Sequence, residues 1–389
     1  MADDSRLGTY VVTSAGGEDV RAFLPPPLPP DPPLELSPAD FDLLERANRA
    51  LGRLDGLAAV LPDTALFVYM YVRKEAVLSS QIEGTQSSLS DLLAHEISGE
   101  LGVPLDDVVE VSSYVAALDH GLERMRGGFP LSLRLVREIH GILLSHGRGA
   151  NKAPGEFRRS QNWIGGTRPG AARYVPPPPE RLMDCLDAFE KFLHDQPGRT
   201  SLLIKAALAH VQFETIHPFL DCNGRLGRLL ITLLLCAEEA LSEPILYLSL
   251  HFKTHRDEYY ERLQRVRTHG EWEEWLRFFL DGVLTVSHQA VDTARAILAL
   301  FDKDRRSLQA LGRPAGSALQ MHEALQKRPL LDVATAAQLT GLSLTTASTS
   351  FARMTDLGIV RELTGRRRDR LFAYGPYLDL LAQGTEPIR

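Results

Sequence analysis

Apolar residues recur at helical spacing through most of the chain, and strand-like alternation is confined to short stretches. The first helix is marked by Ser37 as an N-cap and Pro38 at the first helical position, with Asp40 near the positive end of the dipole. The pattern predicts helices over residues 37–54, 62–82, 104–126, 131–145, 179–195, 201–217, 223–240, 253–268 and 271–312. The chain is therefore predicted to be mainly α.

Two consecutive helices, over residues 201–217 and 223–240, are predicted to lie in the core. The first contains LLIKAALAHVQFETI, in which apolar residues occupy most of the circumference, and the second contains the apolar run LLITLLLCA. Pro218 disfavours the α conformation at His217, so the first helix is expected to end there. The stretch HPFLDCNGRLGR, residues 217–228, is thus expected to join two buried helices.

Three stretches depart from the helical pattern. Residues 21–37 are dense in proline, which fixes φ and lacks a donor, so they are predicted to be extended on a surface or disordered. Residues 160–180 combine glycines, prolines and β-forming residues and are predicted to form a hairpin or flap. After Gly312 the character changes to a short helix, a turn at 341–343, a second helix and two short strands.

The composition is that of an ordinary soluble protein, with 24% charged residues, 44% hydrophobic residues and a net charge of −7. That charge argues against a surface built for non-specific nucleic-acid binding, although it leaves a local basic patch open. Cys185, Cys222 and Cys236 show no CxxC spacing, which favours a reducing compartment without structural zinc. Because we find no signal peptide and no apolar run near the roughly 20 residues of a membrane span, we expect a soluble cytoplasmic protein with no membrane partner.

The stretch 217–228 concentrates groups suited to a nucleotide phosphate. Unpaired N–H groups in a glycine-containing turn that opens a helix form an anion site, and Arg225 and Arg228 can each bind phosphate oxygens from one helix face. Asp221 could hold Mg2+, which needs few protein ligands when phosphate and water complete its shell. His217, with an ordinary pKa of about 6.5, can act as a general base near pH 7. The sequence contains no P-loop.

Each of these residues also has a plainer explanation. Asp221 could be only a helix N-cap, and its spacing from Arg225 could reflect only an i,i+4 ion pair. His217 could be only a core histidine. For any single residue the plainer explanation is favoured, but five polar residues at one turn between buried helices favour a site.

The same stretch resembles the signature of the Fic-domain family, a His-x-Phe-x-acid-Gly-Asn-Gly-Arg-x-x-Arg loop. The resemblance extends over residues 35–285, with QFETIHPF leading into the loop and the flap preceding it. It implies a Fic-type helical core with a small β-hairpin flap. It also implies the transfer of AMP from Mg-ATP to a Ser, Thr or Tyr hydroxyl of a target protein or of the chain itself. Such chemistry depends mostly on positioning and charge stabilisation.

Carried over by position, the resemblance assigns His217 to deprotonate the acceptor hydroxyl, Asp221 to bind Mg2+ and Arg228 to hold the γ-phosphate. Phe219 would anchor the loop in the core. The other residues that it assigns to ATP and its phosphates are Cys222, Asn223, Gly224, Arg225, Leu226, Gly227 and Tyr260.

The flap is implied to pair with an extended target segment as an added strand. The residues that would make this contact are Ile164, Gly165, Gly166 and Thr167. A plain surface hairpin is the alternative. Likewise, Tyr259 and Tyr260 fall where the family often places a nucleotide-pocket tyrosine, but ordinary packing explains them equally well.

Residues 79–84, SSQIEG, resemble a second family element, an inhibitory helix with the pattern Ser/Thr-x-x-x-Glu-Gly/Asn. Ser79, Glu83 and Gly84 match the pattern, and the resemblance implies that Glu83 pairs with Arg228. A carboxylate on that guanidinium removes the partner of the γ-phosphate and repels it, so ATP could not bind productively. The alternative is a surface glutamate near a helix end. Some family members use the same glutamate to direct water for AMP removal.

The C-terminal stretch AAQLTGLSLTTASTSFARMTDLGIV resembles a winged helix-turn-helix, with LTTASTSFARM as the recognition helix and GRRRDR as the wing. Residues 361–370 carry five Arg against one Glu and one Asp, a local charge of +3 that suits DNA phosphates. Arg366 and Arg368 would make such contacts. Protein contacts or packing are equally open as the role of this module, and so is a homodimer.

The expected organisation has four parts: a proline-rich arm over 1–36, a helical region with the inhibitory helix over 37–127, a Fic core with following helices over 128–312, and a winged helix over 313–389. The main alternatives to AMP transfer are AMP removal and transfer of another phosphate-linked group. A third is a DNA-binding regulator whose Fic domain is weakly active.

One position departs from the family signature, because Cys222 stands where glycine is usual. If its φ is positive, a Cβ there costs roughly 1–2 kcal/mol. A tolerated small residue is the plainer explanation. The alternative is a redox-sensitive thiol tuned by the helix N-terminus and the two arginines.

Overall fold

The prediction of a mainly α protein is confirmed by the computed structural model, which describes residues 6–60, 64–89, 91–93, 105–147, 149–364 and 370–387. The helices of the body are α1 (Pro38–Val60), α2 (Thr64–Ile82), α4 (Leu105–Arg126), α5 (Leu133–Leu143), α6 (Pro179–Leu193), α7 (Leu202–Ile216), α8 (Asn223–Ala237), α9 (Ser249–Thr254), α10 (Arg256–His269) and α11 (Trp272–Gln309). In the part of the chain that is described, no helix combines the length and hydropathy needed to cross a bilayer.

Most predicted helices differ from these bounds by a few residues at their ends. The helix predicted over 253–268 differs more, because the backbone leaves the helical region at His255, between α9 and α10. The predicted start of the second helix at Pro62 lies outside the described residues, as does residue 104.

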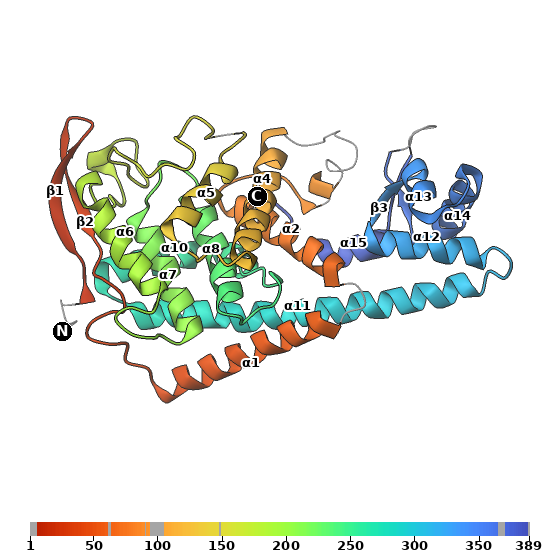
Figure 1. Cartoon of the computed structure of the whole chain (residues 1–389), viewed down its shortest axis with the longest axis horizontal. Helices are drawn as coiled ribbons and strands as arrows, with labels where there is room; N and C mark the ends of the chain where they lie inside the picture. The colour runs from red at the N-terminus through yellow and green to blue at the C-terminus, as the bar shows by residue number, and fades with distance from the viewer. Residues whose placement is uncertain are drawn as a thin grey trace.

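The predicted core pair, α7 and α8, lies within the helical body, away from the C-terminal region (Figure 1). Nearly every residue of α7 is buried, as expected for a helix that is apolar around most of its circumference. α8 contacts α7, α4, α5 and α2, while α11 contacts α7 and runs on toward the C-terminal region. The connection between α7 and α8 is therefore held on several sides.

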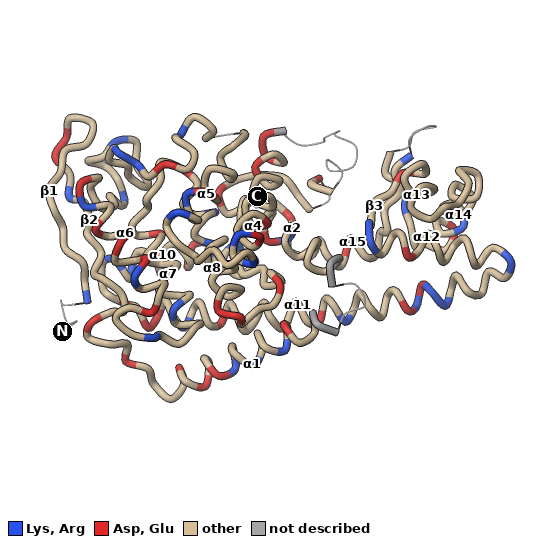
Figure 2. Tube along the Cα trace, in the orientation of Figure 1, with Lys and Arg blue, Asp and Glu red and all other residues tan. Residues whose placement is uncertain are grey.

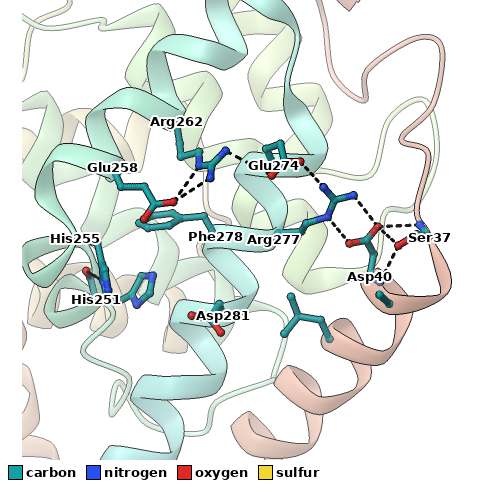
Figure 3. Close-up of a pocket in the computed structure, with 12 residues that line it drawn as sticks. Ser37, Asp40, His251, His255, Glu258, Arg262, Glu274, Arg277, Phe278 and Asp281 are labelled. Atoms are coloured by element: carbon teal, nitrogen blue, oxygen red, sulfur yellow. Dashed lines mark hydrogen bonds and ion pairs between the residues drawn. The ribbon is translucent and has the colours of Figure 1, made fainter.

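The start of α1 is fixed to α11 by a ladder of ion pairs (Figure 3). Ser37 and Asp40 form a capping box, since Asp40 N–H donates to Ser37 Oγ at 3.3 Å and Ser37 N–H donates to Asp40 Oδ2 at 2.8 Å. Asp40 Oδ1 also accepts from Arg277 Nε at 2.6 Å. The ladder continues along a polar hollow of about 540 Å³ through the pairs Arg277–Glu274, Glu274–Arg262 and Arg262–Glu258. The charges of the ladder are paired with one another, so the ladder acts as a structural brace between α1 and α11.

A β-hairpin near the N-terminus was not predicted. β1 (Thr9–Ala15) pairs antiparallel with β2 (Glu18–Leu24) across Gly16 and Gly17, whose φ values are +60° and +82°. A Gly-Gly pair between two runs of β-forming residues is a hairpin signal in this sequence. Of the proline-dense residues 21–37, residues 21–24 belong to β2, and residues 25–36 contain no helix or strand.

The hairpin contacts the flap (Figure 1). Phe23 N–H donates to Val175 O of the flap at 2.9 Å. Glu18 accepts from Arg168 Nη1 at 2.8 Å and from Gly170 N–H at 3.0 Å. The N-terminal segment therefore supports one side of the flap.

The C-terminal region contains α12 (Ala315–Lys327), β3 (Leu330–Asp332), α13 (Val333–Thr340), α14 (Leu344–Asp356), β4 (Arg361–Glu362), β5 (Leu371–Ala373) and α15 (Gly375–Ala382). Its three strands form an antiparallel sheet in the order β3-β5-β4. This element order is compatible with a winged helix, which stays a prediction.

The sequence-predicted wing cannot be described, because Arg366 and Arg368 lie outside the described residues. Figure 2 shows acidic and basic positions interspersed along α1 and along the part of α11 nearest the C-terminal region. DNA binding and a homodimer both stay predictions.

Replacing Asp40 by Asn should lower the free energy of unfolding by about 1–3 kcal/mol, because a charge-assisted bond to Arg277 is lost. The bond to Arg277 holds the pKa of Asp40 well below its ordinary value of 3.8. The stabilisation is therefore present at neutral pH and is lost only as pH falls below about 4. Chemical denaturation at pH 7 measures the change.

The matched control is Asp42→Asn, on the same helix turn. The Asp42 side chain is 63% exposed and lies 3.5 Å from Arg46, so its loss should change stability by less than about 0.5 kcal/mol. Equal losses for the two variants would contradict the proposed brace.

Candidate functional site

The loop between α7 and α8 is bounded by two residues with left-handed backbone conformation. His217 ends α7 with φ +48°, and Cys222 precedes α8 with φ +66°. The Asn223 side chain closes the loop, since its Oδ1 accepts from Phe219 N–H and its Nδ2 donates to Phe219 O, both at 2.9 Å. The loop backbone is therefore held in one shape by its own residues. A direct phosphate contact from Asn223 stays a prediction.

Phe219 is fully buried and attaches the loop to α5. Its ring stacks on His140 with 3.7 Å between centroids. His140 Nδ1 accepts from Gly155 N–H at 2.9 Å, so its Nε2–H is the donor to Asp221 O at 3.2 Å. Burial lowers the pKa of His140 to about 4, which keeps this tautomer neutral at pH 7.

Arg158, which the sequence analysis did not single out, links the flap to the loop. Its Nε donates to His217 O at 2.9 Å, and its backbone N–H donates to Pro218 O at 3.0 Å. From the other end of the flap, Tyr174 OH donates to Thr215 O at 2.7 Å. No sequence signal marks Arg158 beyond its position just before the flap, because its partners are backbone carbonyls far along the chain.

The half-buried His217 is neutral at physiological pH. Burial, followed by the positive charges of Arg267 and Arg158, lowers its pKa to about 3. Its Nδ1 is buried and has no hydrogen-bond partner among the described residues. A neutral imidazole can accept a proton, and because Nδ1 is buried, Nε2 would be the nitrogen that accepts it.

Arg228 lies buried in the first turns of α8 and is held by the residues of the SSQIEG stretch. Its Nη2 donates to Glu83 Oε1 at 2.7 Å, and its Nε donates to Ser79 Oγ at 2.9 Å. Burial alone would lower the pKa of Arg228, but the acidic groups around it, with Glu83 the largest of them, together outweigh burial and raise that pKa above its ordinary value. The ion pair implied by the family resemblance is therefore present in the structure.

Glycine residues allow the Glu83 carboxylate to reach the start of α8. Gly84, directly after it, has φ +101°, which favours glycine. A Cβ on Gly224 would collide with Glu83 Oε1. The carboxylate therefore lies against the helix N-terminus, where a phosphate is also favoured.

Arg225 points to a different carboxylate from the one that holds Arg228. It pairs with Glu110 of α4 at 3.3 Å, and the two side chains are 6% and 5% exposed. The plainer explanation of an Asp221–Arg225 ion pair is wrong, because Glu110 takes that place. The explanation of Asp221 as an N-cap is also wrong, since Cys222 occupies the N-cap position.

Asp221 is the residue that fits a magnesium ion. Its Oδ1 accepts from Cys222 N–H at 2.6 Å, and its Oδ2 approaches Gly149 so closely that a Cβ there would lie 2.8 Å away. The described residues contain no cluster of three or more His, Cys, Asp or Glu that could hold a metal. A single carboxylate beside an anion site nevertheless suits Mg2+, which substrate phosphates and water coordinate as well.

The two tyrosines of α10 have different surroundings. Tyr259 is buried, and its hydroxyl lies 2.9 Å from His210 Nε2, so packing in the core explains it. Tyr260 is half-buried and faces the Glu83–Arg228 pair closely enough that, after burial, Glu83 is the main cause of its raised pKa. A nucleotide contact from Tyr260 stays a prediction.

The flap is closed by one antiparallel bridge between Ile164 and Tyr174, with N–H···O distances of 2.8 and 3.1 Å. Gly165 and Gly166 have φ values of +68° and +78°, and a Cβ on Gly166 would collide with a backbone carbonyl. Thr167 is exposed. The glycines are therefore required by the turn itself, and target docking stays a prediction.

Comparison with known proteins identifies the class. Residues 41–123 match the Fic/DOC family N-terminal region, and residues 130–235 match the Fic/DOC family. This chain is a Fic-domain protein.

The individual relatives agree with this class. Protein adenylyltransferase Fic of Aedes aegypti is 36% identical over 152 residues, which are 39% of this chain and 27% of the relative. The protein of the same name from Culex quinquefasciatus is 29% identical over 246 residues, 62% of this chain and 45% of the relative. The chain thus spans less than half the length of these relatives.

Solved structures show the same fold at lower identity. A Fic family protein from Desulfovibrio desulfuricans G20 aligns with a TM-score of 0.59 at 19% identity, covering 88% of this chain and 97% of that one. Fic-1 from C. elegans aligns with a TM-score of 0.52 at 22% identity, covering 67% of this chain and 75% of that one.

Cys222 occupies a strained backbone position. Its φ of +66° is one that glycine adopts freely, whereas a side chain there costs roughly 1–2 kcal/mol. Burial raises the pKa of its thiol to about 12, with Arg225 opposing this only in part. The alternative of a thiolate-based redox sensor is therefore disfavoured, because such a sensor needs a lowered pKa and access to solvent.

Cys222→Gly should stay within about 1 kcal/mol of the wild-type stability, since relief of strain offsets the lost packing and the added chain entropy. Cys222→Val should lower stability by at least about 2 kcal/mol, because a β-branched residue does not tolerate positive φ. Urea denaturation of both variants measures this. Equal stability of the Val variant and the wild type would contradict the left-handed conformation.

Proposed function

We propose that this chain is a protein adenylyltransferase that Glu83 holds in an inhibited state. The observation that carries the proposal is the Glu83 carboxylate, bonded to the buried Arg228 beside Gly224 at the start of α8. A helix N-terminus with a buried guanidinium favours an anion, and here an intramolecular carboxylate takes that place. The two insect relatives named protein adenylyltransferase Fic support the reaction type.

In the proposed reaction the ATP phosphates replace the Glu83 carboxylate beside Arg228. His217 accepts the proton of a Ser, Thr or Tyr hydroxyl of a target protein, or of the chain itself, as that oxygen bonds to the α-phosphorus. The bond from the α-phosphorus to the oxygen bridging to the β-phosphate breaks, and pyrophosphate leaves with the electron pair. Mg2+ bound through Asp221 would neutralise part of the phosphate charge.

The hydrogen bonds that hold the loop before α8 explain why the site would catalyse this reaction effectively. Arg158 holds the backbone at His217 and Asn223 holds it at Phe219, so His217 and the start of α8 keep a constant relative position. Fixed donors at a developing charge need no reorganisation during the reaction. The flap, attached to the same loop, would present the target segment to His217.

Glu83→Gly should raise the incorporation of AMP at least about tenfold, because the competing charge-assisted bond to Arg228 is lost. Purified wild-type and variant proteins are incubated with Mg2+ and either α-labelled or γ-labelled ATP. Protein labelling from the α position alone means AMP transfer. Labelling from the γ position alone would contradict the proposed reaction, and equal α-labelling of variant and wild type would contradict the brake.

Two further variants control this experiment. Glu239→Gly replaces an exposed glutamate with φ +58° by glycine, so it matches the chemical change far from the brake and should leave labelling unchanged. His217→Ala added to Glu83→Gly should abolish labelling. Labelling that persists in the double variant would contradict the assignment of the base.

The pH dependence of AMP transfer should reflect the lowered pKa of His217. A pKa below the ordinary 6.5 keeps the imidazole neutral as pH falls, so the base form persists in acid. Between pH 8 and about 5.5, kcat/KM of the Glu83→Gly protein for ATP should change less than about twofold. A histidine of ordinary pKa would lose about tenfold over that range. Circular dichroism at each pH confirms folding, and an acid limb centred near pH 6.5 would contradict the buried environment.

A further inference from the structure

Lys74 is a core lysine whose ammonium has no hydrogen-bonded oxygen partner among the described residues, although buried charges normally require one. Lys74 of α2 is 2% exposed, and its Nζ lies over the ring of Tyr247, 4.6 Å from the centroid. No oxygen of the described residues accepts a hydrogen bond from this ammonium. Burial lowers the pKa of Lys74 to about 8, so much of the population still carries the charge at neutral pH.

The chain buries its other core lysine quite differently. Lys205 of α7 is 1% exposed, and its Nζ donates to Asp195 at 3.0 Å and to Glu238 at 2.7 Å. Buried ammonium groups are normally paired in this way, because desolvation without a partner costs several kcal/mol. Lys74 is thus a nearly buried cation to which none of the described residues offers an oxygen acceptor.

Lys74 lines a hollow of about 480 Å³ where α2, α9, α11 and α15 meet. Tyr247, Leu250 and Leu380 supply an apolar surface to the hollow, and Gln289 and Gln383 supply amides. None of the residues 217–228 lines it. A lining that combines apolar side chains with a few polar and charged groups is typical of small-molecule sites.

The acidic groups near the hollow do not neutralise Lys74. Asp292 also lines it, but its side chain is 76% exposed and lies 3.7 Å from Arg295. Glu386 acts on Lys74 only from a distance, without an ion pair, and is exposed to solvent. Glu386 opposes the effect of burial on the pKa of Lys74 without forming an ion pair, and water screens the exposed Asp292.

We propose that this hollow binds a small organic carboxylate. The ligand's carboxylate accepts hydrogen bonds from Lys74 Nζ, and its apolar part lies against Tyr247, Leu250 and Leu380. A single ammonium with Asp292 at the same hollow matches one negative charge and disfavours a phosphate dianion. The site is separate from the proposed AMP transfer and does not depend on it.

Benzoate and its uncharged isostere benzamide test the proposal by isothermal titration calorimetry on the full chain. Benzoate should bind the wild type and bind Lys74→Met at least about tenfold more weakly, since a charge-assisted hydrogen bond is lost. Benzamide should not distinguish the two proteins. Without ligand, Lys74→Met should show a higher denaturation midpoint, because an uncompensated buried charge is removed. That higher midpoint also shows that the variant is folded.

Lys191→Met, an exposed lysine on α6, is the control and should bind benzoate as the wild type does. Three results would overturn the proposal. One is equal binding of benzoate to Lys74→Met and wild type. Another is no binding to the wild type up to about 20 mM, a binding free energy weaker than about 2.3 kcal/mol. The third is a lower denaturation midpoint for Lys74→Met, which would mean that Glu386 or another internal group already compensates the lysine.

Discussion

Two guanidinium groups buried in the first turns of α8 impose the main constraint on this structure. Arg225 and Arg228 are 5% and 2% exposed, and charges so deeply buried must be paired. Glu110 of α4 and Glu83 after α2 provide the partners. The helical N-terminal region is therefore docked on the core by charge compensation as well as by apolar packing. Any external anion that approaches Arg228 competes with a carboxylate from the same chain, which has a high effective concentration.

The second constraint is the backbone of the loop that precedes α8. Its two left-handed residues, His217 and Cys222, place a neutral imidazole and a helix N-terminus at opposite ends of one short turn. The turn keeps this shape because Phe219 is buried, Asn223 closes the loop and Arg158 holds it from outside. Strain at Cys222 persists because the surrounding contacts over-determine the conformation.

Most helices and the motif could be predicted, because helical periodicity and a twelve-residue signature are local properties of the sequence. The pairing of Glu83 with Arg228 could be expected only through the family resemblance. Glu110, Arg158 and the contact of the first hairpin with the flap were not predicted. Each depends on segments far apart in the chain, and nothing in the local sequence identifies the partner. Tyr259 and Tyr260 are adjacent, yet only the packing of α10 separates the core tyrosine from the one beside the ion pair.

The sequence by itself determined the mainly α class, the position of the loop between two buried helices, and the residue types available for phosphate, metal and proton. These follow from spacing and side-chain chemistry, which need no tertiary contact. Only the tertiary structure decided which carboxylate meets which arginine, whether φ at position 222 is positive, and that burial makes His217 neutral. It also placed Lys74 in the core without an oxygen partner among the residues that the structure describes. Such properties arise from desolvation and long-range contacts, which exist only once the helices are packed.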